Sequence, residues 1–515
     1  MDTGSLSYKT LKNISYNFIG YFWPFIFSLF ITPIIVLRLG VEKYGIYMLV
    51  MAISALMGLF DLGIGSTMVK YISEYQSKED NDGIKRLVYS FNYILLGLGV
   101  FGFAALTLIG FWADTLFPSS LVSSGYYLTL FFITGLIFFM NTISATYTVI
   151  PSALQRFDIS TKLGLFNLTF SSLIILALVL SGFGLRAILT TQLVFTLFTF
   201  FLFRHYARRL MPIVKLKYVW NTSEVVNAYK FGVATYVSNA ANASLSYFDR
   251  LFIPFYLGPA ALSYYSLPGN FTAKTPSLIN NISAVIFPMI SSLNGVDDIG
   301  KIKEIYVRVF NLITVLTFAI TISIIMFANK IMLYWLNADF AAKSSGVMVV
   351  LALTYYFLTL AGLLNSFLLG LSKTKFLFKS SLFMALVNVV LLFALLPKFG
   401  IMGAAWAYLL SVLPIIFMFY YTEKSFLKLS GRLSYYAKMY LKLSVTALVF
   451  IPIVKFFILP LVLNLKLVIV FGPVSVALFL VLYKLFGFYD SRDIELINNF
   501  IRLLVGRIRS KKYAL

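Results

Sequence analysis

Three ionisable residues lie within long apolar stretches of this sequence. Asp249 and Arg250 are adjacent in "YFDRLFIPFYLGPAALSYYSLPGN" (residues 247–270), and Lys274 follows shortly after it. Ionisable groups inside a membrane are costly and usually face protein or water. Asp249 can neutralise only one of the two cations, so we expect a net positive charge that binds an anion, and Arg and Lys are common phosphate ligands. A structural ion-pair cluster is the alternative.

Neutral polar residues continue from these charges at intervals of three or four positions, which places each set on one face of a helix. The sets are Asn239, Asn242 and Ser246 before Asp249, Asn270, Ser277 and Asn281 around Lys274, and Asn17 and Ser28 in the first apolar segment. We expect these faces to line one substrate cavity. Alternatively, they hydrogen-bond between packed helices without touching a substrate, as Asn and Ser commonly do in membranes.

The composition requires a membrane environment. The chain has 515 residues, of which 60% are hydrophobic and only 12% are charged, and its mean hydropathy is +0.89. A soluble domain cannot bury that much apolar surface. The sequence has no cysteine and a single histidine, His205, so disulfides and a metal site are not expected. It also lacks the G-x-x-x-x-G-K-[ST] motif of ATP hydrolysis, and we expect no cofactor.

Fourteen apolar segments are long enough to cross a bilayer as helices, which requires about 20 residues each. The predicted class is therefore an all-α polytopic membrane protein. The segments lie near residues 16–37, 44–66, 87–112, 124–150, 163–182, 186–203, 231–256, 262–290, 308–328, 346–370, 379–396, 401–421, 441–463 and 467–486. Most of the 42 Lys and Arg residues then fall on the side of the N-terminus, which predicts that both termini are cytoplasmic. The net charge of +23 therefore reflects cytoplasmic loops rather than nucleic-acid binding.

An internal repeat predicts two pseudo-symmetric lobes of six helices. "LGVEKYGIY" (39–47) is similar to "LGPAALSYY" (257–265), and "FGLRAI" (183–188) is similar to "FGIMGAA" (399–405), at offsets of 218 and 216 residues. Such lobes usually enclose a pathway at their interface. The predicted parts are an N-terminal lobe (1–204), a basic cytoplasmic connection (205–230), a C-terminal lobe (231–421), two added helices (422–486) and an amphipathic cytoplasmic tail (487–515).

Asp61 lies toward the inner end of the second apolar segment. A carboxylate there can carry a coupling proton or sodium ion, or it can pair with Lys70 two turns further on. Prolines such as Pro254, Pro268 and Pro276 fall in the segments that carry the polar faces. Proline bends a helix because it lacks a backbone donor, so these positions favour either a flexing gate or a fixed kink.

The motifs "RLGVEKYGIY", "FDLGIGSTMVKYISE" (60–74) and "YFDRLFIPFYLGPAALSYYS" resemble, in this order, the bacterial polysaccharide flippase family (Wzx-like), within the multidrug/oligosaccharidyl-lipid/polysaccharide exporter superfamily. The resemblance implies a transporter, not an enzyme. Its expected substrate is an undecaprenyl-pyrophosphate-linked oligosaccharide, which such a protein moves from the inner to the outer leaflet of the bacterial cytoplasmic membrane by alternating access, for O-antigen, capsule or exopolysaccharide synthesis. Arg250 and Lys274 suit the pyrophosphate by position. Membrane lipids are expected partners, and a polysaccharide polymerase and a chain-length regulator are candidates.

Two other functions compete with this interpretation. A multidrug or cation extruder of the same superfamily would favour an acidic cavity, whereas the polar faces of the second lobe are net basic. An integral-membrane polysaccharide polymerase would be an enzyme, and such enzymes usually carry a large outer loop with catalytic residues. The longest predicted outer loops, 113–123 and 329–345, are short.

Overall fold

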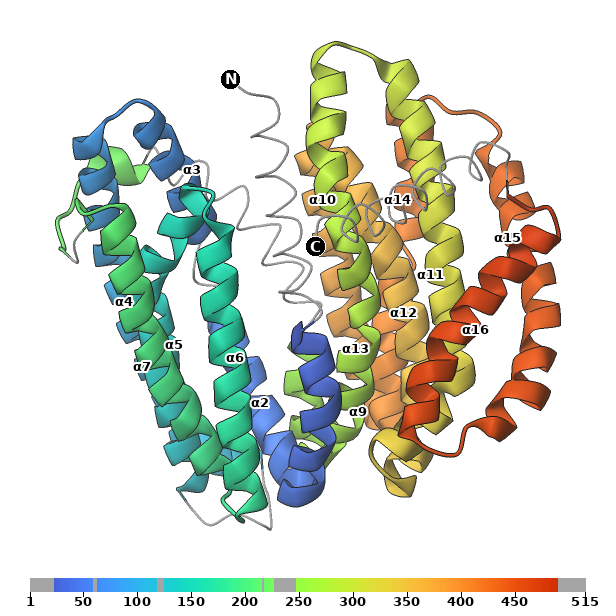
Figure 1. Cartoon of the computed structure of the whole chain (residues 1–515), viewed down its shortest axis with the longest axis horizontal. Coiled ribbons are helices and arrows are strands. Elements are labelled where there is room, and N and C mark those ends of the chain that lie inside the picture. The colour runs from blue at the N-terminus through green and yellow to red at the C-terminus, as the bar shows by residue number, and fades with distance from the viewer. Residues whose placement is uncertain (1–22, 59–62, 118–124, 215–216, 227–246, 490–515) are drawn as a thin grey trace, which may run out of the picture. The chain divides into compact units, whose positions relative to one another are not determined.

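The computed structural model describes residues 23–58, 63–117, 125–214, 217–226 and 247–489. These residues are almost entirely helical, and none of them lies in a strand (Figure 1). The prediction of an all-helical protein is therefore confirmed for the described part of the chain.

The helices follow the predicted apolar segments closely. Up to residue 257, the described chain contains a helix over Trp23–Leu39, α2 (Val41–Met57), α3 (Ile64–Ser77), α4 (Asn81–Leu116), α5 (Tyr126–Ala153), α6 (Phe157–Leu180) and α7 (Leu185–Leu210), followed by a helix over 247–257. The remainder contains α9 (Pro259–Thr272), α10 (Lys274–Gly295), α11 (Ile299–Trp335), α12 (Ala338–Gly370), α13 (Thr374–Val412), α14 (Ile415–Tyr421), α15 (Arg432–Ile453) and α16 (Leu465–Leu485). Short π-helical turns at Thr422–Phe426 and Val454–Ile458 extend α14 and α15.

Nine helices among the described residues are long and apolar enough to cross a membrane, or ten if the bent pair Trp23–Leu39 and Val41–Met57 is counted as one span. One of the nine, Thr374–Phe426, has 53 residues. At about 1.5 Å per residue it is far longer than a bilayer is thick. Gly400 breaks it with a left-handed backbone (φ 60°), where the sequence predicts a turn between two spans. The total of fourteen spans and the cytoplasmic termini remain predictions.

The chain divides into two compact units. The first comprises Met1–Ser266 and Ser381–Ala404, and the second comprises Leu267–Ser380 and Ala405–Leu515. In the first unit α5 packs against α3, α4, α6 and α7, and in the second α11 packs against α10, α12, α15 and α16. The predicted division into lobes at 1–204 and 231–421 is not decided by this grouping and remains a prediction.

Backbone turns repeat along the chain at the interval of the sequence repeat. Left-handed residues come in pairs 217 or 218 positions apart, namely Gly40 and Gly258, Glu79 and Asp297, and Gln155 and Ser372. Helix caps repeat as well: the Asp80 carboxylate accepts from the Gly83 amide at 2.7 Å to begin α4, and Asp298 accepts from Lys301 at 3.0 Å to begin α11. Carboxylates at this position satisfy the free amides of a first helical turn. The two halves of the sequence therefore specify the same local structure.

The eighth predicted segment is interrupted. The sequence predicts one helix over 262–290, but the structure ends α9 at Thr272 and begins α10 at Lys274, with a turn at Ala273. Pro276 explains the interruption, because a proline has no amide to donate to the carbonyl four residues earlier, and its ring clashes with that carbonyl. The hydroxyl of Thr272 instead bonds back to the carbonyls of Pro268 and Gly269, at 2.8 and 3.1 Å.

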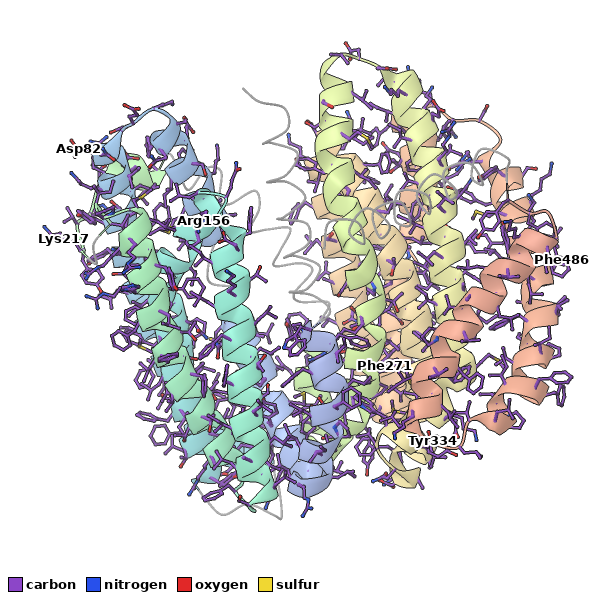
Figure 2. The ribbon with its side chains drawn as sticks, in the orientation of Figure 1. Asp82, Arg156, Lys217, Phe271, Tyr334 and Phe486 are labelled. Atoms are coloured by element: carbon purple, nitrogen blue, oxygen red, sulfur yellow. The ribbon has the colours of Figure 1, made fainter. Side chains whose placement is uncertain are left out.

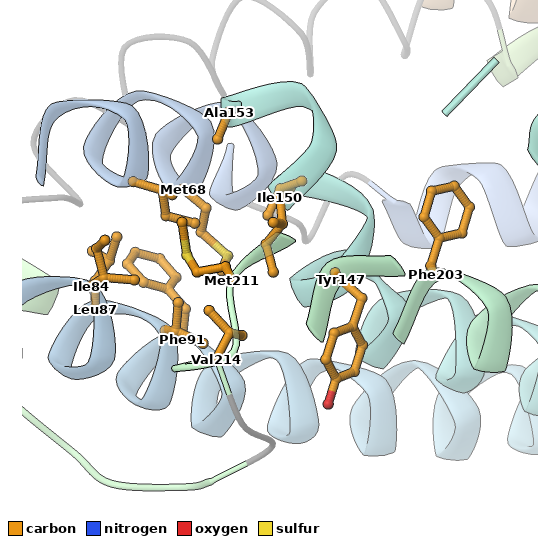
Figure 3. Close-up of a cluster of buried hydrophobic side chains, with 14 of the residues drawn as sticks. Met68, Ile84, Leu87, Phe91, Tyr147, Ile150, Ala153, Phe203, Met211 and Val214 are labelled. Carbon is orange, nitrogen blue, oxygen red and sulfur yellow. The ribbon is translucent and has the colours of Figure 1, made fainter. Parts of the chain in front are cut away.

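An apolar cluster closes one end of the first unit. It joins α3, α4, α5, the end of α7 and the residues that follow α7, and Figure 3 shows Met68, Phe91 and Met211 gathered within it. α3 lies in a stretch that the sequence analysis left between two spans, and it buries Met68 and Ile72 on one face. Asp82, Arg156 and Lys217 all lie toward this same end (Figure 2), as expected for loops predicted to share one side of the membrane.

The connection after α7 is tied to the same end by hydrogen bonds. α7 continues to Leu210, so His205 is helical rather than part of a loop, and the connection begins later than predicted. Its Lys217 carbonyl accepts from the Asn92 side chain at 3.0 Å, and its Glu224 accepts from the Tyr75 hydroxyl at 2.7 Å. Burial, together with the neighbouring carboxylate, raises the pKa of the Tyr75 hydroxyl, so it stays a donor at neutral pH.

Candidate functional site

The structure describes half of the predicted site residues. Asn17, Asp61, Asn239, Asn242 and Ser246 lie outside the described residues, and Asn281 lies in α10 with a side chain that is not described. The roles of these six remain predictions. Ser28, Asp249, Arg250, Asn270, Lys274 and Ser277 are described.

Asp249 is buried in the interior of the first unit. Its side chain lies on the helix over 247–257 and the residue is 3% exposed. One carboxylate oxygen accepts from the Arg250 backbone amide at 2.8 Å, and the other accepts from the hydroxyl of Tyr265 in α9. Among the described residues, no ion pair involves Asp249, and the expectation that it neutralises one of the two cations remains a prediction. Hydrogen bonds hold this carboxylate, as a buried charge requires.

Arg250 lies beside aromatic rings. Its guanidinium lies over the Tyr247 ring, 5.6 Å from the ring centroid, within the range of a cation–π interaction. It is also within electrostatic range of the Tyr44 hydroxyl of α2. Arginine in such a setting keeps its charge and its planar set of donors. The structure therefore places a permanent cation and a buried carboxylate next to each other in an otherwise apolar helix.

Close packing between α2 and α9 fixes Tyr265 opposite Asp249. Gly45 of α2 faces the Pro259 carbonyl so closely that a Cβ at Gly45 would lie 1.8 Å from its oxygen. Beside this contact, the Ser263 hydroxyl donates to the Val41 carbonyl at 2.6 Å. Both helices begin after a left-handed glycine, Gly40 or Gly258. Glycine adopts that conformation without a steric penalty. The turn at Gly258 therefore sets the direction of α9, and with it the position of Tyr265 relative to Asp249.

Lys274 lies at the break between α9 and α10. It is the first residue of α10 and is half-buried. The Ser277 hydroxyl, one turn later, donates a hydrogen bond to the Ala273 carbonyl at 3.2 Å, which favours a structural role for this side chain. Asn270 precedes the break and is partly buried. Because Arg250 belongs to the first unit and Lys274 to the second, a joint anion site formed by both remains a prediction.

Ser28 lines a neutral cavity inside the first unit. The cavity has a volume of about 320 Å³ and lies among the helix over Trp23–Leu39, α2, α6 and α7. The described part of its polar lining consists of Ser28, Thr32, Tyr44, Tyr47, Ser171, Ser172 and Gln192, none of which is charged. The Gln192 amide donates to the Tyr47 hydroxyl at 2.8 Å. Uncharged hydrogen-bonding groups of this kind suit hydroxyl-rich ligands.

Sequence reasoning missed three of these residues as site members. Tyr44 and Tyr47 lie in the first repeat motif and Tyr265 in the second, but the motif was used only to find the repeat. Tyr47 and Tyr265 are repeat equivalents, 218 positions apart, and each hydroxyl bonds to a polar side chain on another helix. The recurrence of a tyrosine at the same position of both repeat motifs could have indicated that these two residues belong to the site. Gln192 offered a second signal, since it interrupts an apolar run.

A family model and two known proteins match large parts of this chain. A family model described as polysaccharide biosynthesis protein matches residues 36–344, more than half of the sequence. A putative O-antigen transporter of Shigella flexneri is 21% identical over 430 residues, covering 78% of this chain and 95% of that protein. A probable flippase, AglR of Haloferax volcanii, is 25% identical over 248 residues, covering 47% of this chain and 50% of that protein.

Solved structures share the fold. The lipid II flippase MurJ in an inward closed conformation superposes with a TM-score of 0.71 at 16% identity, covering 91% of this chain and 98% of MurJ. A multidrug resistance MATE family transporter in an inward-facing conformation gives 0.64 at 13% identity, covering 79% and 96%. The resemblance to polysaccharide flippases found in the sequence is thus confirmed: this chain is a multi-span helical membrane protein that belongs to the polysaccharide biosynthesis protein family.

Proposed function

We propose that the protein is a flippase for undecaprenyl-pyrophosphate-linked oligosaccharides. It moves them from the inner to the outer leaflet of the bacterial cytoplasmic membrane, in the service of surface polysaccharide synthesis. The observation that carries the proposal is Arg250, a cation kept inside an apolar helix and flanked by Tyr247 and a hydrogen-bonded Asp249, in a chain of this family. The family supports transport of a lipid-linked glycan, and the cation supplies the chemistry for its pyrophosphate.

The pyrophosphate and the sugars of such a substrate need different chemical environments, and the first unit contains both kinds of environment. A pyrophosphate needs positive charge and donors, which the Arg250 guanidinium provides. A sugar needs neutral hydrogen-bonding groups, which the cavity beside Ser28 provides. Tyr44 belongs to the cavity lining and is also within electrostatic range of Arg250. In the proposal Arg250 holds the pyrophosphate while the neutral cavity receives hydroxyl groups of the glycan.

Lys274 is the second proposed pyrophosphate ligand, and the break at Ala273 gives it a mechanical context. A helix that is already interrupted bends at little cost, because its backbone hydrogen bonds are already rearranged. We propose that movement at this break changes the environment of Lys274 during alternating access. Asp61 remains the candidate for coupling to a proton or sodium ion.

A multidrug or cation extruder is the second candidate, because the fold is shared with a multidrug transporter. An extruded cation needs an available carboxylate. The Asp249 carboxylate already accepts from the Tyr265 hydroxyl and the Arg250 amide, and no acidic residue is among the described residues that line the neutral cavity. These observations favour an anionic substrate over a cationic one.

The test is genetic and chemical. The gene is deleted in its host, and surface polysaccharide and lipid-linked intermediates are measured after rescue with wild type, with Arg250→Ala/Lys274→Ala, or with a control. Arg186→Ala is a matched control, because its guanidinium also lies over a tyrosine, Tyr126, at 4.8 Å, but at the start of α7.

The proposal predicts that deletion abolishes surface polymer and that lipid-linked units accumulate on the inner leaflet. The double variant, inserted at normal levels, fails to rescue, whereas the Arg186 control rescues. Full rescue by the double variant would remove the two cations from the mechanism. Unchanged polysaccharide in the deletion strain, with altered drug sensitivity, would replace the flippase with the extruder.

A further inference from the structure

A basic, aromatic-lined pocket lies in the second unit and shares no lining residue with the cavity beside Ser28. It has a volume of about 400 Å³ and is formed by α11, α15, α16 and the residues after α16. Its lining includes Asn311, Tyr435, Lys438, Lys442, Tyr483 and Phe488. The beginning of α15 and the end of α16 meet here, at the side of the membrane predicted to be cytoplasmic.

The two lysines of this pocket are one helical turn apart on α15. The sequence analysis placed Lys438 outside the thirteenth apolar segment, whereas α15 in fact begins at Arg432 and carries both lysines on one face. Like charges at this spacing repel each other. Among the described residues neither lysine forms an ion pair; Lys442 instead donates to the Phe488 carbonyl at 3.4 Å.

No acidic side chain is found in the described lining of this pocket. Between Glu423 and Asp490 the sequence contains no Asp or Glu. Glu423 itself is engaged by Arg432 at 3.2 Å and by the Tyr436 hydroxyl. The pocket is therefore positively charged, with an amide and tyrosine hydroxyls as further polar groups around the charges.

An apolar stripe runs from the lysines along the outer face of α15. Leu441 is 64% exposed and Leu448 is 72% exposed, with Val445 between them. Together with Lys438 and Lys442 they recur at intervals of three or four residues, which places them on one face. Two cations at the membrane surface, followed by an exposed apolar stripe, match the shape of a lipid with an anionic headgroup and hydrocarbon tails.

We propose that this pocket binds the phosphate of an anionic membrane lipid. Lys438 and Lys442 hold the phosphate, and the lipid chains follow the stripe of Leu441, Val445 and Leu448. The Tyr435 hydroxyl donates to the side-chain oxygen of Asn311, which leaves the NH2 group of this amide to donate to the phosphate. Basic pockets between membrane helices on the cytoplasmic side bind such headgroups. The phosphate belongs either to a bulk phospholipid or to a polyprenyl carrier, and both offer the same chemistry to the lysines.

Lipid binding to the purified full-length protein tests the proposal. Native mass spectrometry is used to titrate phosphatidylglycerol, undecaprenyl phosphate and phosphatidylcholine in separate arms. Lys438→Gln/Lys442→Gln is compared with Lys455→Gln/Lys466→Gln, which removes the same charge near the opposite ends of α15 and α16. Each lysine near a membrane surface contributes about 1 kcal/mol toward anionic lipid, so the pocket variant, which removes two lysines, should lose about thirtyfold in affinity.

The arms separate the possible sources of the phosphate. If Lys438→Gln/Lys442→Gln loses affinity for phosphatidylglycerol alone, the ligand of the pocket is a bulk phospholipid. If it loses affinity for undecaprenyl phosphate alone, the ligand is the carrier lipid. Equal losses in both double variants, or no loss in either, would overturn the proposal. Lys438→Arg/Lys442→Arg should retain binding, which separates lost charge from misfolding. The readout is independent of flipping, so the proposal stands or fails apart from the proposed function.

Discussion

Tyr265 donates its hydroxyl to the buried carboxylate of Asp249, and Tyr47, its repeat equivalent, accepts from the amide of Gln192. The two tyrosines occupy the same place after the same glycine turn. Their partners differ in charge. One copy of the motif therefore supports a charged site, and the other supports a neutral cavity, on equivalent local backbones.

Removing the hydroxyl of Tyr265 should destabilise the charged site. Tyr265→Phe deletes a hydrogen bond to a buried carboxyl group, and leaving such a group without its partner typically costs about 1–3 kcal/mol. We expect a lower melting temperature of the detergent-solubilised protein and weaker rescue of surface polysaccharide. Tyr256→Phe is the control, because Tyr256 lies on the helix over 247–257 and is 40% exposed. Equal melting temperatures for the two variants would show that the hydrogen bond does not support Asp249.

Filling the space at Gly45 should disrupt the first unit. A methyl group at Gly45 would overlap the Pro259 carbonyl oxygen, and backbone cannot move aside as a flexible side chain does. Gly45→Ala should therefore reduce the yield of folded protein, measured by size-exclusion chromatography in detergent. Gly164→Ala in α6 meets nothing within 4 Å, and there the higher helix propensity of alanine should stabilise by up to about 1 kcal/mol. Similar behaviour of the two variants would contradict the close approach of α2 and α9.

Breaking the ion pair between Glu423 and Arg432 should be costly. Their side chains are 2% and 10% exposed, and Tyr436 also donates to Glu423. Removing one partner of a buried pair leaves an uncompensated charge and costs about 3–5 kcal/mol. Glu423→Gln should therefore lower the melting temperature far more than Glu304→Gln. Glu304 pairs with Arg308 at 52% and 32% exposure, where loss of the pair costs below about 0.5 kcal/mol.

The double variant Glu423→Leu/Arg432→Met provides the second half of this test. Replacement of both partners by apolar residues removes both charges together, so stability should recover relative to Glu423→Gln. A double variant as unstable as the single one would mean that the residues act through packing rather than charge.

The hydrogen bond in the neutral cavity should contribute modestly to stability and more to transport. A double-mutant cycle with Gln192→Leu and Tyr47→Phe should give a coupling of about 0.6 kcal/mol in thermal unfolding, the usual value between membrane helices. If the cavity receives a glycan, each single variant should nevertheless reduce surface polysaccharide clearly. Normal surface polysaccharide in both single variants would show that Gln192 and Tyr47 contribute to helix packing and not to transport.

Apolar length determined what was predictable in the fold. The described parts of the predicted spans are helical, because about 20 apolar residues leave the backbone few alternatives to a helix in a membrane. Short or mixed segments were harder. α3 was missed because its apolar residues cover only one face, and the start of α15 was placed late because Lys438 and Lys442 lower its hydropathy.

The candidate site was predictable as residues but not as contacts. Asp249 and Arg250 stand out because charge in an apolar run is rare. Their partners do not, since Tyr265 is one of 33 tyrosines and reaches Asp249 only through the turn at Gly258. The interruption at Ala273 was missed although Pro276 was visible, because a single proline predicts a bend without telling whether the helix continues beyond it.

The paired left-handed turns carry a record of descent. Unrelated helical segments have no reason to place their irregular residues at one constant interval, so the two halves derive from one ancestral unit by duplication and fusion. After a duplication, substitutions can accumulate in one copy at positions that the other copy keeps unchanged. In one copy the tyrosine after the glycine turn meets an uncharged amide, and in the other it meets an acid next to an arginine. An originally symmetric protein thereby acquired an uncharged environment in one half and a charged one in the other.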